Sequence, residues 1–253
     1  MPRFYIDPES WDESNLRLEG DEFHHCVNVL RLQSGDPVVI FDGLGMEIQT
    51  SIKDISKKVA YLDLNNQERI ISPTRKTKIA LAQAIPKGKN MDLIIEKGTE
   101  LGVNHIYPFI SERTIIRLNQ SDSIKKQEKW QRVAIEACKQ SGQNWLPKVE
   151  QPQKLLSMID SLIHEFDLVL IASLQPAAKH LKQILLNRTT KHPESILILI
   201  GPEGDFTLSE TAKAIEAGAE SMTLGPITLR TETAAIYSVS VVAHELLYNS
   251  IIF

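Results

Sequence analysis

The feature that most constrains this chain is an alternation of apolar, strand-like runs with helix-like stretches that starts at Thr77. Strands are predicted over residues 78–82, 103–110, 167–172, 196–200 and 221–224, and helices over residues 91–101, 123–141, 177–186, 208–217 and 231–249. This alternation is typical of βαβ units, whose strands pair in parallel and whose helices cover both faces of the sheet. The sequence therefore predicts an α/β domain.

The first 72 residues have a different pattern, in which short apolar runs are separated by turns. Strands are predicted over residues 37–41, 46–55 and 59–64, with a tight turn at Asp42-Gly43-Leu44-Gly45 and one helix over residues 22–32. Several short strands with a single helix favour a small β-barrel. Since Pro73 follows directly, we expect two domains, residues 1–72 and 73–253.

The composition excludes several classes of protein. A chain of 253 residues, 42% of them hydrophobic, can bury a core without disulfides or metals. Its two cysteines, Cys26 and Cys138, form no CxxC motif, so neither a disulfide scaffold nor a metal site is expected. The longest apolar run, residues 196–200, is far shorter than the roughly 20 residues that span a bilayer. Because the N-terminus also lacks the apolar segment of a signal peptide, we expect a cytoplasmic protein.

The net charge of −4 is unevenly distributed along the chain. Residues 73–148 carry 14 Lys and Arg against 7 Asp and Glu, whereas both flanking segments are acidic. Basic runs are often no more than solvated helix faces, but they also form surfaces that contact nucleic-acid phosphates. Lys125, Lys126, Lys129 and Arg132 share one face of a predicted helix by their spacing, which favours contact with RNA.

Two loops that each join a strand to a helix carry the residues most suited to chemistry. The first, Gly201-Pro202-Glu203-Gly204-Asp205-Phe206, precedes a helix whose start, Thr207-Leu208-Ser209-Glu210, has the pattern of a capping box. Ligands of open α/β sheets bind beyond the carboxyl ends of strands, and Gly201 and Gly204 allow a backbone to approach a ligand closely. Because ordinary strand-to-helix turns use the same residues, this loop alone is weak evidence.

The second loop runs from Leu224-Gly225 to Arg230-Thr231-Glu232, with Thr231 available as the N-cap of the last predicted helix. Glu232 lies in the first turn of that helix, where the dipole favours an acid. Arg230 and Glu232 are either solvated residues at a helix start or residues that face a ligand. The second interpretation gains weight because Arg230 is the only arginine after Arg188.

Together, these motifs resemble the RsmE family of SPOUT methyltransferases, which methylate N3 of a uridine in 16S ribosomal RNA. The resemblance is carried at the C-terminal end by Gly201-Pro202-Glu203-Gly204 and by Leu229-Arg230-Thr231-Glu232-Thr233-Ala234. Matching motifs occur earlier in the same order, at Leu18 to His25, Val29-Leu30-Arg31, Phe41-Asp42-Gly43, Gln83 to Gly88, Glu96 to Val103, Ser111 to Thr114 and Glu136 to Ser141. The likeness therefore extends over nearly the whole chain.

The resemblance implies S-adenosylmethionine as the cofactor and methyl donor, and a homodimer that acts on 16S rRNA or the small ribosomal subunit. It also implies a SPOUT-type parallel sheet with a trefoil knot, preceded by a PUA-like barrel that binds RNA. The cofactor would contact Leu199, Ile200, Gly201, Glu203, Gly204, Leu224, Gly225, Ile227, Leu229 and Ala234. Lys87, Arg113 and Gln140 would join Lys125, Lys126, Lys129 and Arg132 in contacting RNA.

In this family context, Arg230 is the candidate for contacting the substrate, and a carboxylate is the candidate base. Arg230 would stabilise the uracil anion or grip a phosphate. Glu232 or Glu203 could take the N3 proton, although deprotonation to solvent is equally open, and Glu203 could instead hold the cofactor or bond to a neighbouring loop. The chain departs from the usual family pattern at Asp205, where glycine is common, at Ile227, where arginine is common, and near Gln143, where another arginine is common.

Two other functions compete with methylation. A non-catalytic RNA-binding protein could keep the barrel and the basic patch but lose the cofactor, which the intact Gly201, Gly204, Gly225 and Arg230 disfavour. A small-molecule enzyme that binds a nucleotide would need a GxGxxG or Walker loop, and the sequence has neither.

Overall fold

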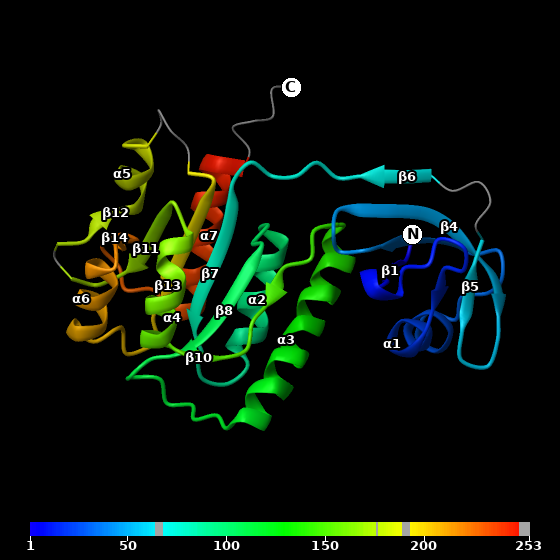
Figure 1. Cartoon of the computed structure of the whole chain (residues 1–253), viewed down its shortest axis with the longest axis horizontal. Helices are drawn as coiled ribbons and strands as arrows, with labels where there is room; N and C mark the ends of the chain where they lie inside the picture. Colours follow the sequence, from blue (N-terminus) through cyan, green and yellow to red (C-terminus); the bar gives the residue numbers. More distant parts are fainter. Residues whose placement is uncertain (64–67, 176, 189–192, 248–253) are drawn as a thin grey trace. The chain divides into compact units, whose positions relative to one another are not determined.

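The computed structural model describes residues 1–63, 68–175, 177–188 and 193–247 (Figure 1). The chain forms two compact units that are not two uninterrupted stretches of sequence. The first unit comprises Met1–Thr74 together with Ile135–Leu146, and the second comprises the described parts of Arg75–Ala134 and Pro147–Phe253. The last residues of helix α3 (Gln120–Ser141) thus belong to the first unit.

The first unit is built on a six-stranded, mostly antiparallel sheet with the order β1-β3-β4-β5-β2, in which β6 also pairs with β4. Its strands are β1 (Arg3–Tyr5), β2 (Arg17–Leu18), β3 (Pro37–Phe41), β4 (Met46–Ile55), β5 (Ala60–Leu62) and β6 (Glu68–Ile71). Phe4, Leu18, Ile40, Ile52 and Leu62 come from five different strands and pack in one core. A sheet in which five strands face one core must curl around it, as expected for a small barrel-like domain, whereas β6 is exposed along its length.

The helix of this unit differs from the one predicted over residues 22–32. It begins as α1 (Gly20–Phe23) and continues as a π-helix, η2 (His24–Val29). The wide turns are seen in the hydrogen bond from the Leu30 N–H to the His25 carbonyl, 2.9 Å. Arg31 has a φ of +56°, and this left-handed conformation ends the helix before Leu32. A short 3-10 helix, η1 (Pro8–Ser10), precedes it.

The second unit contains an eight-stranded sheet in which every pairing is parallel, with the order β10-β8-β7-β13-β11-β14-β12 and with β9 paired to β8. The strands are β7 (Lys78–Ala84), β8 (His105–Ile110), β9 (Lys148–Val149), β10 (Gln153–Lys154), β11 (Leu168–Ala172), β12 (Lys179–His180), β13 (Ser195–Ile200) and β14 (Glu220–Thr223). The central strand β13 pairs Ile198 with Leu81 of β7 and with Leu170 of β11. The predicted α/β domain with a parallel sheet is confirmed.

Helices cover both faces of this sheet, as Figure 1 shows. They are α2 (Asn90–Glu100), α3, α4 (Leu155–Leu162), α5 (Leu181–Leu186), α6 (Leu208–Glu216) and α7 (Thr231–Leu247), with a short 3-10 turn, η3 (Ile163–Glu165). Ala80 and Ala82 of β7 pack with Met158 of α4 and Ala214 of α6. Because side chains alternate along a strand, Gln83 lies on the opposite face, where α7 contacts β7 and β13.

The sequence missed one helix and misplaced the start of another. The buried side chains of α4 give it an apolar face, but its eight residues are too few for a clear helical period. The helix predicted over residues 177–186 begins only at Leu181, because Lys179 and His180 pair with β14 as strand β12. The predicted end of the last helix, at residue 249, lies outside the described residues. Within the described part of the chain, no helix is long and apolar enough to cross a membrane.

Candidate active site

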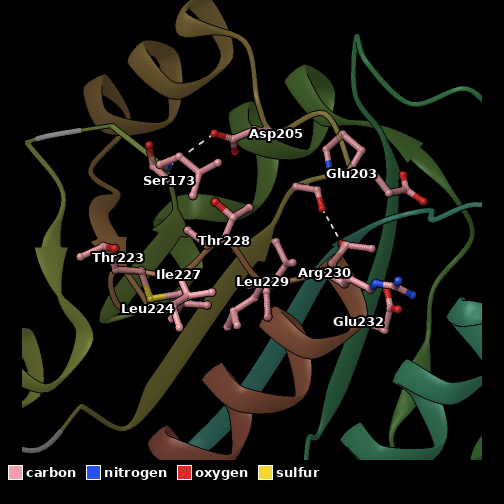
Figure 2. Close-up of a pocket in the computed structure, with 18 of the residues that line it drawn as sticks. Ser173, Glu203, Asp205, Thr223, Leu224, Ile227, Thr228, Leu229, Arg230 and Glu232 are labelled. Carbon is pink, nitrogen blue, oxygen red and sulfur yellow. Dashed lines mark hydrogen bonds between the residues drawn. The ribbon is translucent and has the colours of Figure 1, made fainter.

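A pocket of about 450 Å³ opens at the carboxyl ends of β11, β13 and β14 (Figure 2). The two loops that the sequence singled out both line it, together with residues at the end of β11 and in the loop that follows. Parallel strands end at one edge of their sheet, so loops far apart in sequence meet there. The fold therefore places the pocket where ligands of α/β domains bind.

The loop after β13 is held by hydrogen bonds to its neighbours. The Gly201 carbonyl accepts a hydrogen bond from the Thr231 hydroxyl, 2.7 Å, and the Glu203 carboxylate accepts one from the Lys87 backbone N–H, 2.9 Å. Asp205 adopts a φ of +60°, which explains why glycine suits this position. Of the roles proposed for Glu203, the structure shows the bond to a neighbouring loop.

Helix α6, which follows this loop, begins with the predicted capping box. The Thr207 hydroxyl accepts a hydrogen bond from the Glu210 N–H, 3.2 Å, and the Glu210 carboxylate accepts one from the Thr207 N–H, 2.9 Å. Glu210 is buried and also accepts a hydrogen bond from the Glu112 N–H, 2.8 Å. The neighbouring Arg113 donates to the Gly204 carbonyl, 2.6 Å. The segment after β8 is thereby fixed against the loop after β13.

The second loop comprises residues 224–230 and is followed by α7. Thr231 is the first residue of this helix rather than its N-cap. The Thr231 side chain is instead turned toward the sheet, where its hydroxyl accepts a hydrogen bond from the Gln83 amide, 3.0 Å, while donating to Gly201. The Gln83 amide also donates to the Ala84 carbonyl, 2.8 Å. This buried chain of hydrogen bonds joins β7, the loop after β13 and the start of α7. Gly225, at a φ of +131°, provides the turn after β14.

The pocket brings together most of the residues predicted to bind the cofactor. Eight of them line it, namely Ile200, Gly201, Glu203, Leu224, Gly225, Ile227, Leu229 and Ala234. Leu199 does not, because the alternation of β13 turns its side chain into the core against α4 and α6. Gly204 also lies outside the lining, beside Arg113.

Both residues predicted to be catalytic line the pocket. Arg230 is exposed and Glu232 is half-buried, and they flank Thr231 at the amino-terminal end of α7 (Figure 2). Glu203, the other candidate base, also lines the pocket, but one of its carboxylate oxygens is engaged by Lys87. A guanidinium and a carboxylate at the pocket wall can stabilise an anion and accept a proton.

None of the residues predicted to contact RNA lines the pocket. Lys125, Lys129 and Arg132 are exposed on α3, although Lys129 forms an ion pair with Asp92 of α2 and Lys126 lies 5.4 Å from the ring centre of Trp130. The side chain of Lys87 is exposed in the loop after β7, and Arg113 is exposed beside Gly204. Gln140, also exposed, belongs to the part of α3 in the first unit.

Sequence reasoning missed the pocket residues at the end of β11 and in the loop that follows it. Ala172, Ser173 and Leu174 line the pocket, as do Asp205 and Thr228. The strand that ends at Ala172 was predicted, and a residue just beyond a parallel strand lies at the same edge as the two loops. That signal could have found Ser173 and Leu174.

The pocket suits the cofactor that the family resemblance implies. Ile200, Leu224 and Leu229 provide apolar wall, which an adenine ring requires. Among the residues that the structure describes, the backbone N–H groups of Ile227 and Leu229 donate to no protein acceptor. Such free donors beside an apolar wall can bind the polar edge of a base. S-adenosylmethionine therefore fits the residues present.

Two protein-family models match the chain. The model of an RNA methyltransferase domain matches residues 73–243, and that of an RNA methyltransferase PUA domain matches residues 18–64. The first match contains every residue that lines the pocket.

Proteins that resemble this chain in sequence or structure are named as methyltransferases. A ribosomal RNA small subunit methyltransferase E from Bacillus subtilis is 30% identical, over 97% of either chain. A solved structure of this methyltransferase from Neisseria gonorrhoeae, bound to S-adenosyl methionine, is 33% identical and has a TM-score of 0.81, over 96% of this chain and 97% of that one. A methyltransferase from Legionella pneumophila, solved with bound SAM, is 31% identical with a TM-score of 0.85, over 96% of each chain.

These matches favour catalysis over the non-catalytic alternative, with S-adenosylmethionine as the methyl donor. They also agree with the fold, a SPOUT-type parallel sheet preceded by a PUA-like unit. From sequence, fold and pocket together, this chain belongs to the ribosomal RNA small subunit methyltransferase E family.

Proposed function

We propose that this protein transfers a methyl group from S-adenosylmethionine to N3 of a uridine in the RNA of the small ribosomal subunit. The observation that carries the proposal is that Arg230 and Glu232 line the same pocket as the predicted cofactor-binding residues. When bound, the cofactor supplies an electrophilic methyl group on a positively charged sulfur. The protein must then position the uracil and help N3 to lose its proton.

Arg230 is the residue that we assign to the uracil. Loss of the N3 proton leaves negative charge on the uracil imide, and a guanidinium can stabilise that charge with two parallel hydrogen bonds. Arg230 is exposed at the pocket wall and is the only basic side chain among the described lining residues. It is therefore free to contact a base that approaches from solvent.

Glu232 is the preferred candidate to receive the proton. It lines the pocket two residues after Arg230, on the first turn of α7. Glu203 is a weaker candidate because its carboxylate accepts a hydrogen bond from Lys87 and holds two loops together. Direct loss of the proton to water is the remaining route, and a Glu232→Gln variant separates these possibilities.

The rest of the molecule would hold the RNA. We assign this role to the PUA-like domain, predicted as residues 1–72, and to Lys125, Lys126, Lys129 and Arg132 on α3 of the domain predicted as residues 73–253. Lys87, Arg113 and Gln140 would add contacts. A ribosomal RNA substrate places the enzyme in the cytoplasm.

We further infer a homodimer and a trefoil knot from the family resemblance. Helices α2 and α7 contact each other and carry the partly exposed apolar side chains Leu93 and Tyr237, 40% and 41% exposed, which a second subunit could cover.

Transfer of label from methyl-labelled S-adenosylmethionine to small-subunit RNA tests this function directly. We expect label at N3 of one uridine, found by nucleoside analysis and located by primer extension. Incubation of the labelled cofactor with RNA but without the protein is the control. Label on another atom or another RNA would overturn the assignment of substrate. Near-normal turnover of Glu232→Gln, with intact cofactor binding, would remove Glu232 from the mechanism.

A further inference from the structure

Asp205 gives the pocket a carboxylate whose position is fixed by the backbone. It lines the pocket in the loop after β13, with a φ of +60° that few non-glycine residues adopt. One carboxylate oxygen accepts a hydrogen bond from the Phe206 N–H, 2.8 Å, and the other faces the Leu174 N–H at 3.4 Å. Aspartate is among the residues that tolerate this conformation because its side chain can bond to the local backbone.

The negative charge of Asp205 is not neutralised by a neighbouring cation. Among the described residues, its carboxylate has no ion-pair partner, and both of its hydrogen bonds come from uncharged backbone N–H groups. Arg230, the basic residue of the pocket wall, lies at the other end of the pocket. Figure 2 shows Asp205 beside Ser173, well apart from Arg230 and Glu232. The wall near Ser173 is therefore negatively charged.

We propose that Asp205 makes the pocket select the positively charged methyl donor over its uncharged product, an inference that rests on the proposed function. At neutral pH, S-adenosylmethionine carries a positive sulfonium, an ammonium and a carboxylate, and its net charge is +1. S-adenosylhomocysteine lacks the sulfonium charge and is neutral. A cation bound in this pocket of about 450 Å³ shares it with the Asp205 carboxylate, and water and salt screen the attraction only in part because the Debye length is about 8 Å at physiological salt.

The reaction itself removes the charge that Asp205 would attract. The bond between sulfur and the methyl carbon breaks with its electron pair left on sulfur, which becomes a neutral thioether. The methyl carbon bonds to N3 through the electron pair that N3 retains when its proton leaves to the base or to water. The attraction from Asp205 is thus present before transfer and lost afterwards, which favours release of the product.

Binding measurements on three ligands test this role without relying on activity. Calorimetry would give the affinities of S-adenosylmethionine, of S-adenosylhomocysteine and of sinefungin, an unreactive analogue with an amine in place of the sulfonium. Asp205→Asn removes the charge, keeps the size and tolerates the positive φ. Asp160→Asn, which removes an exposed carboxylate on α4 outside the pocket, is the matched control.

At low salt, we expect Asp205→Asn to weaken the binding of both cationic ligands about three- to tenfold relative to the wild type. The affinity for S-adenosylhomocysteine should stay within about twofold of the wild-type value. The loss should shrink as salt is added, and Asp160→Asn should bind all three ligands as the wild type does. If the affinity for all three ligands fell equally, Asp205 would act only by shaping the loop, and the proposal would be overturned. An unchanged affinity for all three ligands would overturn it as well. Failure of the wild-type protein to bind any of the three would instead refute the proposed function.

Discussion

The buried hydrogen bonds of Thr231 predict a measurable loss of both stability and cofactor affinity in Thr231→Val. Valine keeps the shape of the side chain but leaves the Gly201 carbonyl without its donor and one Gln83 N–H without its acceptor. Thr231 is 4% exposed and Gln83 is fully buried, so water cannot replace these bonds. The remaining Gln83 N–H keeps its bond to the Ala84 carbonyl.

The magnitude follows from the number of groups left unpaired. An unsatisfied buried donor or acceptor costs about 1–3 kcal/mol, so two of them should lower the free energy of unfolding by roughly 2–6 kcal/mol. For a domain of this size, where 1 kcal/mol shifts Tm by about 2–4 °C, that loss corresponds to a fall of about 4–24 °C in Tm. Because the same bonds fix Gly201 in the pocket wall, affinity for S-adenosylmethionine should fall as well.

Urea unfolding followed by circular dichroism measures the effect on stability. Thr233→Val, at an exposed position on the same turn of α7, is the control and should change stability by less than about 0.5 kcal/mol. A double-mutant cycle with Gln83→Leu should give a coupling energy of about 0.5–3 kcal/mol. The reasoning is wrong if Thr231→Val is as stable as the control variant, or if the two single effects simply add.

Three further predictions concern catalysis, RNA binding and pH. Arg230→Ala should lower the rate of single-turnover methylation about 100- to 1000-fold while cofactor affinity by calorimetry stays within a few-fold, and a normal rate would exclude Arg230. Neutralising Lys125, Lys126, Lys129 and Arg132 of α3 should reduce the slope of log affinity for RNA against log salt by about 1 to 3. Neutralising the exposed Lys182 and Lys213 should leave that slope unchanged, and equal slopes for the two variants would exclude the patch. Burial, together with the positive charge of Lys139 at 3.0 Å, lowers the pKa of His25 in the folded protein. The contribution of His25 to the free energy of unfolding is therefore present above pH about 6.5, the ordinary pKa of histidine, and is lost as the pH falls through the lowered pKa. The difference in unfolding free energy between wild type and His25→Gln should therefore shrink from pH 7 to pH 5, and a constant difference would contradict this.

The sequence by itself determined the class of the fold and the two loops of the site. The run from Ile196 to Ile200 is apolar at every position because β13 is buried on both faces of a parallel sheet. The capping box at Thr207 and Glu210 is equally local, since both of its hydrogen bonds join residues three apart. Such features can be read from sequence because neighbouring residues suffice to produce them.

The π-helical turns of η2 and the start of α5 were not predicted for the opposite reason. Residues His24–Val29 were predicted as part of an ordinary helix, and their sequence carries no local signal for the wider turns, in which Cys26 packs in the core of the first unit. Lys179 and His180 form a strand because β14 offers them an edge to pair with, and that strand lies more than thirty residues further along the chain. Pairing over such a distance leaves no local pattern.

The tertiary structure alone decided what each site residue contacts. Thr231 has the sequence context of an N-cap, yet its hydroxyl bonds to Gly201 and Gln83, which the parallel sheet brings to the same edge. Leu199 is adjacent to the pocket in sequence, but the alternation of β13 turns it into the core. In the sequence, Asp205 is only a departure from the family motif. In the structure it is a negatively charged residue of the pocket wall, because the fold places it beside the loop after β11. Sequence specifies which side chains are available, whereas their contacts depend on which strands lie side by side.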